Sequence, residues 1–133
     1  MLVILQRYER FVSRSTPNIT IINKYLSDEE YDSILKSTKY MLLPYNEKYS
    51  AASSGVIFDI LFNGRPLITR DFLNFHFVKE YGVGTLYTES IAELDYDTLL
   101  DDENVAATCK KIDAFLEDNY QSGLRLRNYI MGE

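Results

Sequence analysis

The chain has few of the residues that disulfides, metal sites and histidine-based catalysis require. It contains one cysteine, Cys109, and one histidine, His76, among 133 residues. A single cysteine excludes an intrachain disulfide and any metal site built from several cysteines. One histidine without the partners of a catalytic triad favours a half-buried structural imidazole. We therefore expect no metal centre and a reducing environment.

The sequence also lacks a long apolar run and an excess of basic residues. No stretch reaches the roughly 20 apolar residues that a membrane-spanning helix needs. Residues 1 to 5 are apolar but have neither the basic segment nor the cleavage site of a signal peptide. The net charge of −6 argues against a surface for nucleic acid or anionic membrane. We expect a cytoplasmic protein with no membrane span and no nucleic-acid partner. Peripheral attachment to the inner membrane through a parent enzyme stays open.

What the chain contains is a regular alternation of apolar segments and turn residues. Its 46% hydrophobic and 26% charged content suit a globular protein, and 133 residues fit one domain. Strand patterns fall at residues 19 to 23, 40 to 43, 67 to 69 and 85 to 87. Helix patterns fall at residues 28 to 37, 54 to 63, 72 to 81, 103 to 119 and 122 to 130. This alternation predicts one α/β domain over residues 1–133, a three-layer sandwich with a parallel sheet.

The first segment is ambiguous. Apolar residues recur at helical spacing over residues 2 to 13, which predicts a helix there, with a short strand at residues 2 to 5 as the alternative. Signals for helix ends are clearer. Ser27 and Glu30 form a capping box, while Asp71, Ser90 and Asp95 stand where N-caps are expected. Gly64 and Gly82 are expected to end helices in the left-handed conformation.

The loop before residue 56 is the strongest functional signal. A buried strand, a small-residue loop, a helix, Gly64-Arg65-Pro66 and a second strand make a βαβ unit. Such a loop can present backbone N–H groups to a phosphate, and the dipole of the following helix favours negative charge there. The simpler alternative is a serine N-cap at Ser54.

An ordered set of motifs resembles the carboxyl-terminal half of a GT-B glycosyltransferase, of the retaining group that uses nucleotide-sugar donors. The resemblance covers most of residues 18 to 88. Its motifs are Asn18-Ile19-Thr20-Ile21-Ile22, Leu26-Ser27-Asp28-Glu29-Glu30, Leu42-Leu43-Pro44-Tyr45, Ser54-Gly55-Val56, Gly64-Arg65-Pro66-Leu67-Ile68 and Tyr81-Gly82-Val83-Gly84. It implies a Rossmann-like domain, half of a GT-B fold, that binds the donor and takes part in polysaccharide biosynthesis.

The resemblance also implies roles for individual residues. The donor diphosphate would be held at Ser53, Ser54, Gly55 and Val56. The carboxylate that binds the donor ribose would be Asp59, five residues before Gly64. A solvated aspartate is the alternative for that residue. No cofactor is expected, because the nucleotide-diphosphate sugar is a substrate.

Four further residues are candidates for contacts with the base or sugar. Tyr45 and Tyr49 flank the donor loop and could stack on a ring, and Lys24 and Tyr25 lie near the position where the family places the nucleobase. Ordinary loop residues are an equal alternative for Lys24 and Tyr25. Arg65 could contact a phosphate, although a solvated arginine beside a turn is favoured.

The chain departs from the family in ways that affect function. Ala51 stands where the family's first acid of a Glu-x7-Glu pair falls. The acceptor domain and the first strand of the donor domain, with its glycine-rich loop, are not recognisable. We therefore expect a hexosyltransferase-type parent enzyme whose donor domain alone is inactive and needs an acceptor domain or partner chain. The alternatives are a non-catalytic Rossmann-like interaction module, which could form homo-oligomers, and part of a GT-B-fold sugar epimerase.

Overall fold

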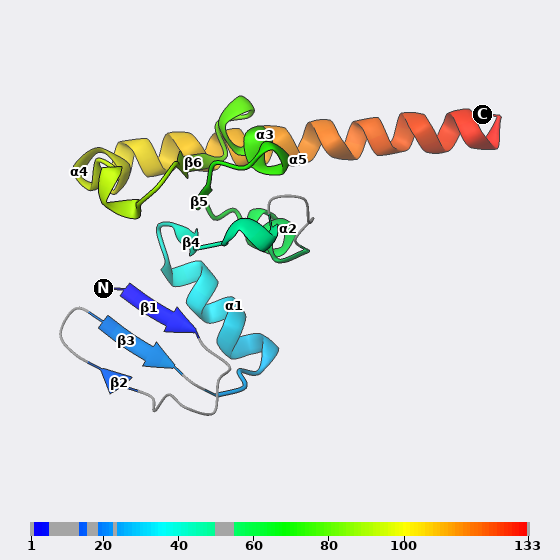
Figure 1. Cartoon of the computed structure of the whole chain (residues 1–133). Coiled ribbons are helices and arrows are strands. Elements are labelled where there is room, and N and C mark those ends of the chain that lie inside the picture. The colour runs from blue at the N-terminus through cyan, green and yellow to red at the C-terminus, as the bar shows by residue number, and fades with distance from the viewer. Residues whose placement is uncertain (1, 6–13, 16–18, 23, 50–54, 133) are drawn as a thin grey trace. The chain divides into compact units, whose positions relative to one another are not determined.

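The computed structural model describes residues 2–5, 14–15, 19–22, 24–49 and 55–132 (Figure 1). The described residues are mixed helix and strand, as expected for an α/β protein. The chain divides into two compact units, residues 1–34 and residues 35–133. Each unit has its own three-stranded sheet, so the single sheet that the sequence predicts is found as two.

The sheet of the first unit contains strands β1 (Leu2–Leu5), β2 (Arg14–Ser15) and β3 (Ile19–Ile22) in the order β1-β3-β2. Strand β1 runs parallel to β3, and β2 runs antiparallel to it. The helix predicted from residue 2 is therefore wrong at its start, and the alternative strand is confirmed. A short apolar run fits both periodicities, and here pairing with β3 decides for the strand. Residues 6–13 lie outside the described residues.

Helix α1 (Asp28–Ser37) begins at the predicted capping box. The Glu30 backbone N–H donates to Ser27 Oγ at 3.2 Å, and the Ser27 N–H donates to Glu30 Oε2 at 3.0 Å. These two bonds lower the number of unsatisfied N–H groups in the first turn. The Lys24 ammonium, 2.7 Å from Glu30 Oε1, holds the pKa of this carboxyl below its ordinary value, and the Ser27 N–H acts in the same direction.

The sheet of the second unit is fully parallel. Its strands β4 (Met41–Leu43), β5 (Leu67–Arg70) and β6 (Gly84–Tyr87) pair in chain order, with Met41 opposite Leu67 and Leu67 opposite Gly84. Helix α2 (Gly55–Phe62) connects β4 to β5. A 3-10 helix η2 (Leu73–Phe75) and helix α3 (His76–Glu80) connect β5 to β6. Apolar side chains from these elements and from the turn before β6 form the core: Ile57, Ile60, Leu61, Leu67, Phe75, Val78 and Val83.

Three glycines stand where the backbone conformation or a close neighbour disfavours any other residue. Gly64 and Gly82 end α2 and α3 with φ of 67° and 66°, as predicted. Gly84 is required for another reason, because a Cβ there would lie 2.2 Å from the Leu67 carbonyl oxygen on β5. The predicted cap at Asp71 is wrong: Phe72 is the N-cap of η2 and makes no side-chain cap hydrogen bond. The Asp71 carboxylate instead lies 2.9 Å from His76 Nε2.

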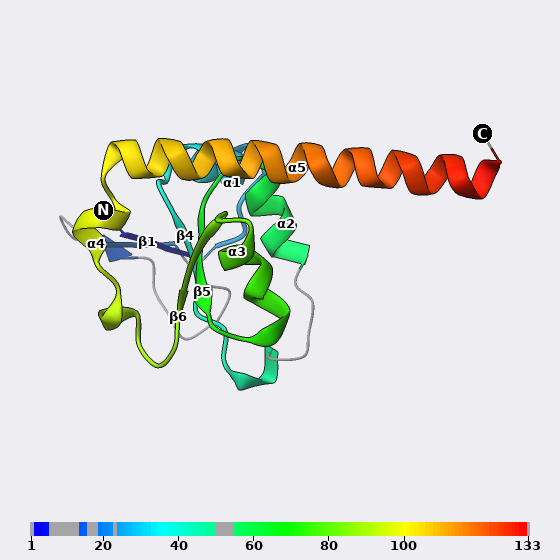
Figure 2. The ribbon, with the colours of Figure 1, turned by 90° about the horizontal axis from the view of Figure 1, so that it is seen from above.

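The remaining elements are a 3-10 helix η3 (Ile91–Glu93), helix α4 (Tyr96–Leu99) and helix α5 (Asp102–Met131). Ser90 and Asp95 cap η3 and α4 as predicted, and Asp101 caps α5. Two helices were expected where α5 is one continuous helix (Figure 2). Gly123 falls in its interior, and one glycine costs a helix only about 1 kcal/mol, which does not end it. Within the described part of the chain, no helix is long and apolar enough to cross a membrane.

Candidate functional site

The candidate site lies at the carboxyl edge of the parallel sheet. Strands β4, β5 and β6 end at Leu43, Arg70 and Tyr87, and parallel pairing brings these ends to one edge. The Asp71 N–H donates to the Tyr87 carbonyl at 2.8 Å, which ties the chain after β5 to the end of β6. The Thr69 hydroxyl donates to the Leu43 carbonyl at 3.2 Å and ties β5 to β4. Ligands of open α/β sheets bind at this kind of edge.

Arg70 places a positive charge at this edge. Its Nε donates to the Thr88 carbonyl at 3.2 Å, and its guanidinium carbon lies 5.3 Å from the centre of the Phe72 ring. Its Nη2 lies 3.9 Å from Glu47 Oε1 in the 3-10 helix η1 (Glu47–Tyr49), which follows β4. An exposed ion pair at that distance contributes little. Arg70 is therefore oriented by Thr88 and Phe72 and could exchange Glu47 for another anion.

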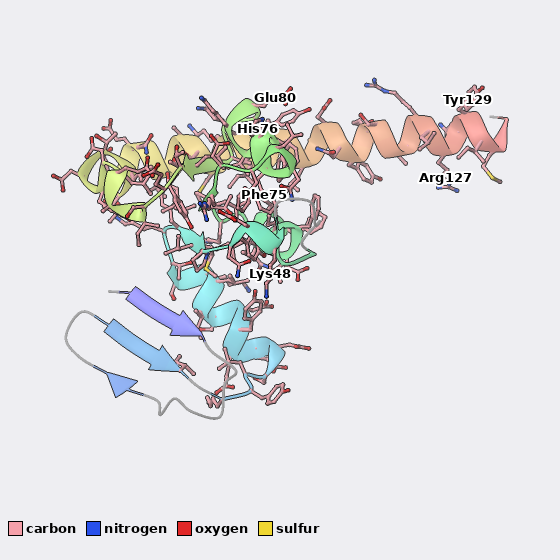
Figure 3. All side chains as sticks on the ribbon, in the orientation of Figure 1. Lys48, Phe75, His76, Glu80, Arg127 and Tyr129 are labelled. Carbon is pink, nitrogen blue, oxygen red and sulfur yellow. The ribbon has the colours of Figure 1, made fainter. Side chains whose placement is uncertain are left out.

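Aromatic side chains line the chain between β4 and α3. The Tyr45 ring, just after β4, stacks on Phe75 with centroids 5.5 Å apart and an interplanar angle of 30°. Phe75, which is labelled in Figure 3, is buried. Its ring packs in turn against Phe72, with centroids 6.3 Å apart. Tyr45 is thus fixed at one edge of the site, and its contact with Phe75 competes with stacking on a ligand.

Helix α2 begins where the sequence predicts a phosphate loop. Ser53 and Ser54 lie outside the described residues, so their part of the prediction stays open. Gly55 is the first residue of α2, and a Cβ built on it would meet no atom of the described residues within 4 Å. Packing therefore does not require a glycine there. Val56 follows, partly exposed, and the N–H groups of this first turn point along the axis toward the N-terminus.

Asp59 lies on the exposed side of α2, one turn after Gly55. The buried side of the helix is formed by Ile57, Ile60 and Leu61. The Asn63 side-chain amide donates to the Asp59 backbone carbonyl at 2.9 Å. The Asp59 carboxylate is thus accessible to a ligand, although exposure also suits the alternative of a solvated residue.

The other predicted contact residues are less well placed or not described in full. Lys24 and Tyr25 belong to the first unit, where Lys24 pairs with Glu30 and Tyr25 is exposed. The backbone of Tyr49 is part of η1, between Arg70's partner Glu47 and α2. Of these four residues, Tyr45 is the one whose ring is described close to the site. It stacks on Phe75, and Phe75 packs against Phe72, the residue whose ring faces Arg70.

Three residues singled out by the sequence lie away from this edge or have structural contacts. Arg65 precedes β5, at the amino edge of the sheet, and its Nη1 donates to the Thr38 carbonyl at 3.0 Å. His76 pairs with Asp71 as described above. Cys109 Sγ lies 3.5 Å from the Gly64 carbonyl and is half-buried on α5. Arg65 is therefore not a phosphate ligand at the carboxyl edge.

Arg70 is the residue that reasoning from the sequence missed. A signal was present, because a basic residue directly after an apolar strand of a parallel sheet stands at the ligand-binding edge. The same edge contains Tyr87, a buried tyrosine whose pKa is raised by desolvation despite the opposing charge of Arg70. Its hydroxyl stays protonated at neutral pH and can donate a hydrogen bond.

The acidic segment before α5 is used for helix caps rather than gathered around an ion. The Thr98 hydroxyl donates to Asp95 Oδ2 at 2.6 Å, and the Asp101 carboxylate accepts from two N–H groups of α5. Lys39 lies 2.6 Å from Asp102. Among the residues that the structure describes, no three His, Cys, Asp or Glu side chains are grouped to hold a metal ion.

Comparisons with protein-family models, curated proteins and solved structures give no significant match.

Proposed function

We propose that this chain is the donor-binding domain of a retaining glycosyltransferase that uses a nucleotide-sugar donor. The observation that supports the proposal is the parallel β4–α2–β5 unit, in which the N-terminus of α2 follows the carboxyl end of β4, at the sheet edge that contains Arg70. A nucleoside diphosphate is an anion of matching chemistry. Backbone amides, a helix dipole and a guanidinium favour it together.

The pairing of the strands supports a doubly wound donor domain. Such sheets run 3-2-1-4-5-6, so strand 1 separates strand 2 from strand 4. A chain without strand 1 would form two separate sheets, 3-2 and 4-5-6. The parallel pair β1–β3 and the parallel sheet β4–β5–β6 have those pairings, with β2 as an antiparallel edge strand. In this proposal, strand 1 and the acceptor domain come from residues outside the sequence.

In the proposed mechanism, the site stabilises the leaving diphosphate. Charge builds up on the phosphate oxygens as the sugar–phosphate bond breaks. N–H groups of residues 53 to 56 would donate to those oxygens, and Arg70 would add a positive charge in exchange for its weak contact with Glu47. Asp59 would accept hydrogen bonds from the ribose hydroxyls. The acceptor domain would position the acceptor and exclude water.

The test is a titration of the ¹⁵N-labelled chain with uridine and guanosine diphosphates, followed by NMR. We expect the amides of residues 53 to 57 and of Arg70 to shift. Gly55→Ala should weaken binding about tenfold or more by crowding the diphosphate, without loss of fold, since the site has room for a methyl group. Gly123→Ala is the matched control, because a Cβ at that glycine also meets no atom within 4 Å.

A second pair of variants compares the carboxyl edge of the sheet, at Arg70, with the amino edge, near Arg65. Arg70→Gln should weaken nucleotide binding, whereas Arg65→Gln, at the amino edge, should not. Thermal unfolding of both variants checks that any loss is not a loss of fold. Absence of shifts at millimolar nucleotide, or equal effects of the two arginine variants, would contradict the proposal.

A second candidate function is a non-catalytic module that docks a partner through α2. Phe62 is 70% exposed and Val56 is 43% exposed, which gives this helix an apolar outer side. Phe62→Ser should abolish association through α2 and leave nucleotide shifts intact. A chain that ignores nucleotide but loses association on this change would favour the module over the enzyme domain.

A further inference from the structure

Tyr87 is a buried tyrosine whose hydroxyl has no partner in the described part of the chain. It is the last residue of β6 and is 7% exposed. A buried tyrosine hydroxyl usually finds a hydrogen-bond partner, but no group of the described residues bonds this one. Its oxygen is not one of their enclosed, unpartnered polar atoms, so it is open to solvent. A polar donor on a buried ring is thus presented at the carboxyl edge of the sheet.

Arg70 lies beside this hydroxyl. It is the register partner of Tyr87 across β5 and β6. Residues paired in this way carry their side chains on the same face of a sheet. Arg70 Nε donates at 3.2 Å to the carbonyl of Thr88, the residue that follows Tyr87. The guanidinium is therefore held over the end of β6, on the face that carries the Tyr87 side chain.

The terminal nitrogens of Arg70 have no strong acceptor among the described residues. Phe72 lies against the guanidinium, with its ring centre 5.3 Å from the guanidinium carbon. Nη2 approaches Glu47 Oε1 only to 3.9 Å, which is longer than a hydrogen bond. The Glu47 side chain is 83% exposed and can turn away into solvent. The edge therefore offers guanidinium N–H groups and one hydroxyl to a ligand that accepts hydrogen bonds.

The donor set indicates the class of that ligand. Burial raises the pKa of the Tyr87 hydroxyl more than the charge of Arg70 lowers it, so the hydroxyl is protonated at neutral pH. An arginine fork binds two oxygens of a carboxylate or a phosphate side by side. A carboxylate has no further oxygen for the tyrosine. A phosphoryl group has a third oxygen, which makes it the better match.

We propose that Arg70 and Tyr87 form a phosphoryl subsite, in which the guanidinium binds two oxygens of one phosphoryl group and the Tyr87 hydroxyl donates to a third. Glu47 is the internal competitor that leaves Arg70 when the phosphoryl group binds. The natural ligand, the diphosphate of a nucleotide-sugar donor, rests on the proposed function. The affinity of the subsite for phosphoryl oxygens rests on its own geometry.

Inorganic pyrophosphate is the probe, because it carries phosphoryl oxygens without a base or a sugar. The full chain is labelled at the Cζ of its tyrosines and at its amides and is titrated by NMR. The Tyr87 Cζ signal, assigned by its loss in Tyr87→Phe, should shift because Cζ bears the hydroxyl. The amides of Arg70 and Thr88 should shift with it and give the dissociation constant.

Tyr87→Phe should weaken pyrophosphate binding about fivefold to tenfold, because it removes one hydrogen bond to a charged group. It retains the buried ring, and thermal unfolding checks that the fold is unchanged. Tyr81→Phe is the matched control. It makes the same change before β6 begins, at the amino edge of the sheet, where Tyr81 is 45% exposed, and should leave binding unaltered.

Glu47→Gln should change the affinity in the opposite direction. Without the competing carboxylate, Arg70 should bind pyrophosphate about twofold more tightly, as expected for the loss of a weak exposed ion pair. A Tyr87 signal that does not shift at millimolar pyrophosphate overturns the subsite. Equal affinities of Tyr87→Phe and the unaltered chain overturn it as well.

Uridine diphosphate separates the subsite from the proposed function. Binding of uridine diphosphate at residues 53 to 57 that is insensitive to Tyr87→Phe would retain the donor domain and overturn the subsite. Binding of pyrophosphate that depends on Tyr87, without binding of uridine or guanosine diphosphate, would support the subsite and contradict the donor domain.

Discussion

The two halves of α5 have the same sequence periodicity and different surroundings. In the first half, Ile112 is fully buried and Phe115 contacts Phe77 and Tyr81, with ring centroids 5.9 and 4.9 Å apart. In the second half, Ile130 repeats the position of Ile112 and is exposed. An amphipathic pattern therefore predicts that a helix has an apolar face, but it does not predict which surface covers that face. For the first half the partner is this chain's own core.

The largest expected effect is on packing. Ile112→Ala should destabilise the chain by about 2–5 kcal/mol, because it leaves a cavity in a closed core. Ile130→Ala at low protein concentration should change stability by less than about 0.5 kcal/mol, because the site is already solvated. Urea unfolding of the two variants measures the difference. Similar losses would mean that the second half is packed in solution.

The start of the packed half should be sensitive to its cap. Asp101→Ala should cost about 1 kcal/mol, because its carboxylate accepts from the N–H groups of Glu103 and Asn104 at 3.1 and 3.2 Å. Asp101→Asn, which can still cap, serves as the control and should lose much less. Thermal unfolding is the measurement. An equal loss for both variants would assign the effect to charge instead.

The exposed half should respond to helix propensity. Gly123→Ala should stabilise the helix locally by up to about 1 kcal/mol, because alanine loses less backbone entropy and the methyl group meets no neighbour. Hydrogen exchange of amides near residue 123 should slow by up to about fivefold. The global unfolding midpoint should barely move, since the core does not depend on this segment. A large global shift would contradict the separation of the two halves.

The smallest effect concerns pH. The hydrogen bond and charge of Lys39 hold the pKa of Asp102 below its ordinary value. A lowered pKa in the folded state stabilises the chain above the unfolded value, about 3.9 for aspartate, and this contribution is lost as pH falls through the lower folded value. NMR titration of the Asp102 carboxyl should show a midpoint below that of an unfolded aspartate. Lys39→Met should raise it, and an unchanged midpoint would argue against the contact.

Much of the local structure was predictable because it depends on neighbouring residues. The capping box of Ser27 and Glu30 and the caps at Ser90 and Asp95 are confirmed, as are the left-handed glycines 64 and 82. A cap or a glycine turn is decided within about four residues. The part of the site that was predicted and described, Gly55 at the start of α2, follows from the same local logic.

The features that differ from the prediction depend on contacts between residues far apart in the chain or on the absence of a local competitor. Local periodicity favours a helix over residues 2 to 13, with a strand at residues 2 to 5 as the alternative, because pairing with β3 lies outside any local window. Asp71 pairs with His76 rather than capping η2, and α5 continues through Gly123 because nothing competes with the helix there. The position of Arg70 at the candidate site could not be predicted locally, because it depends on which ends of the strands lie at the same edge of the sheet.

Sequence patterns alone indicate most of the strands, helices, caps and turns of this chain and the apolar faces of its helices, because these depend on short-range sterics and hydrogen bonds. Tertiary structure decided that the strands pair as two sheets, that Arg70, Tyr45 and the start of α2 belong to one unit, and that one half of α5 is buried while the other is not. Those outcomes depend on contacts between residues far apart in the chain, where burial and strand pairing outweigh local preference.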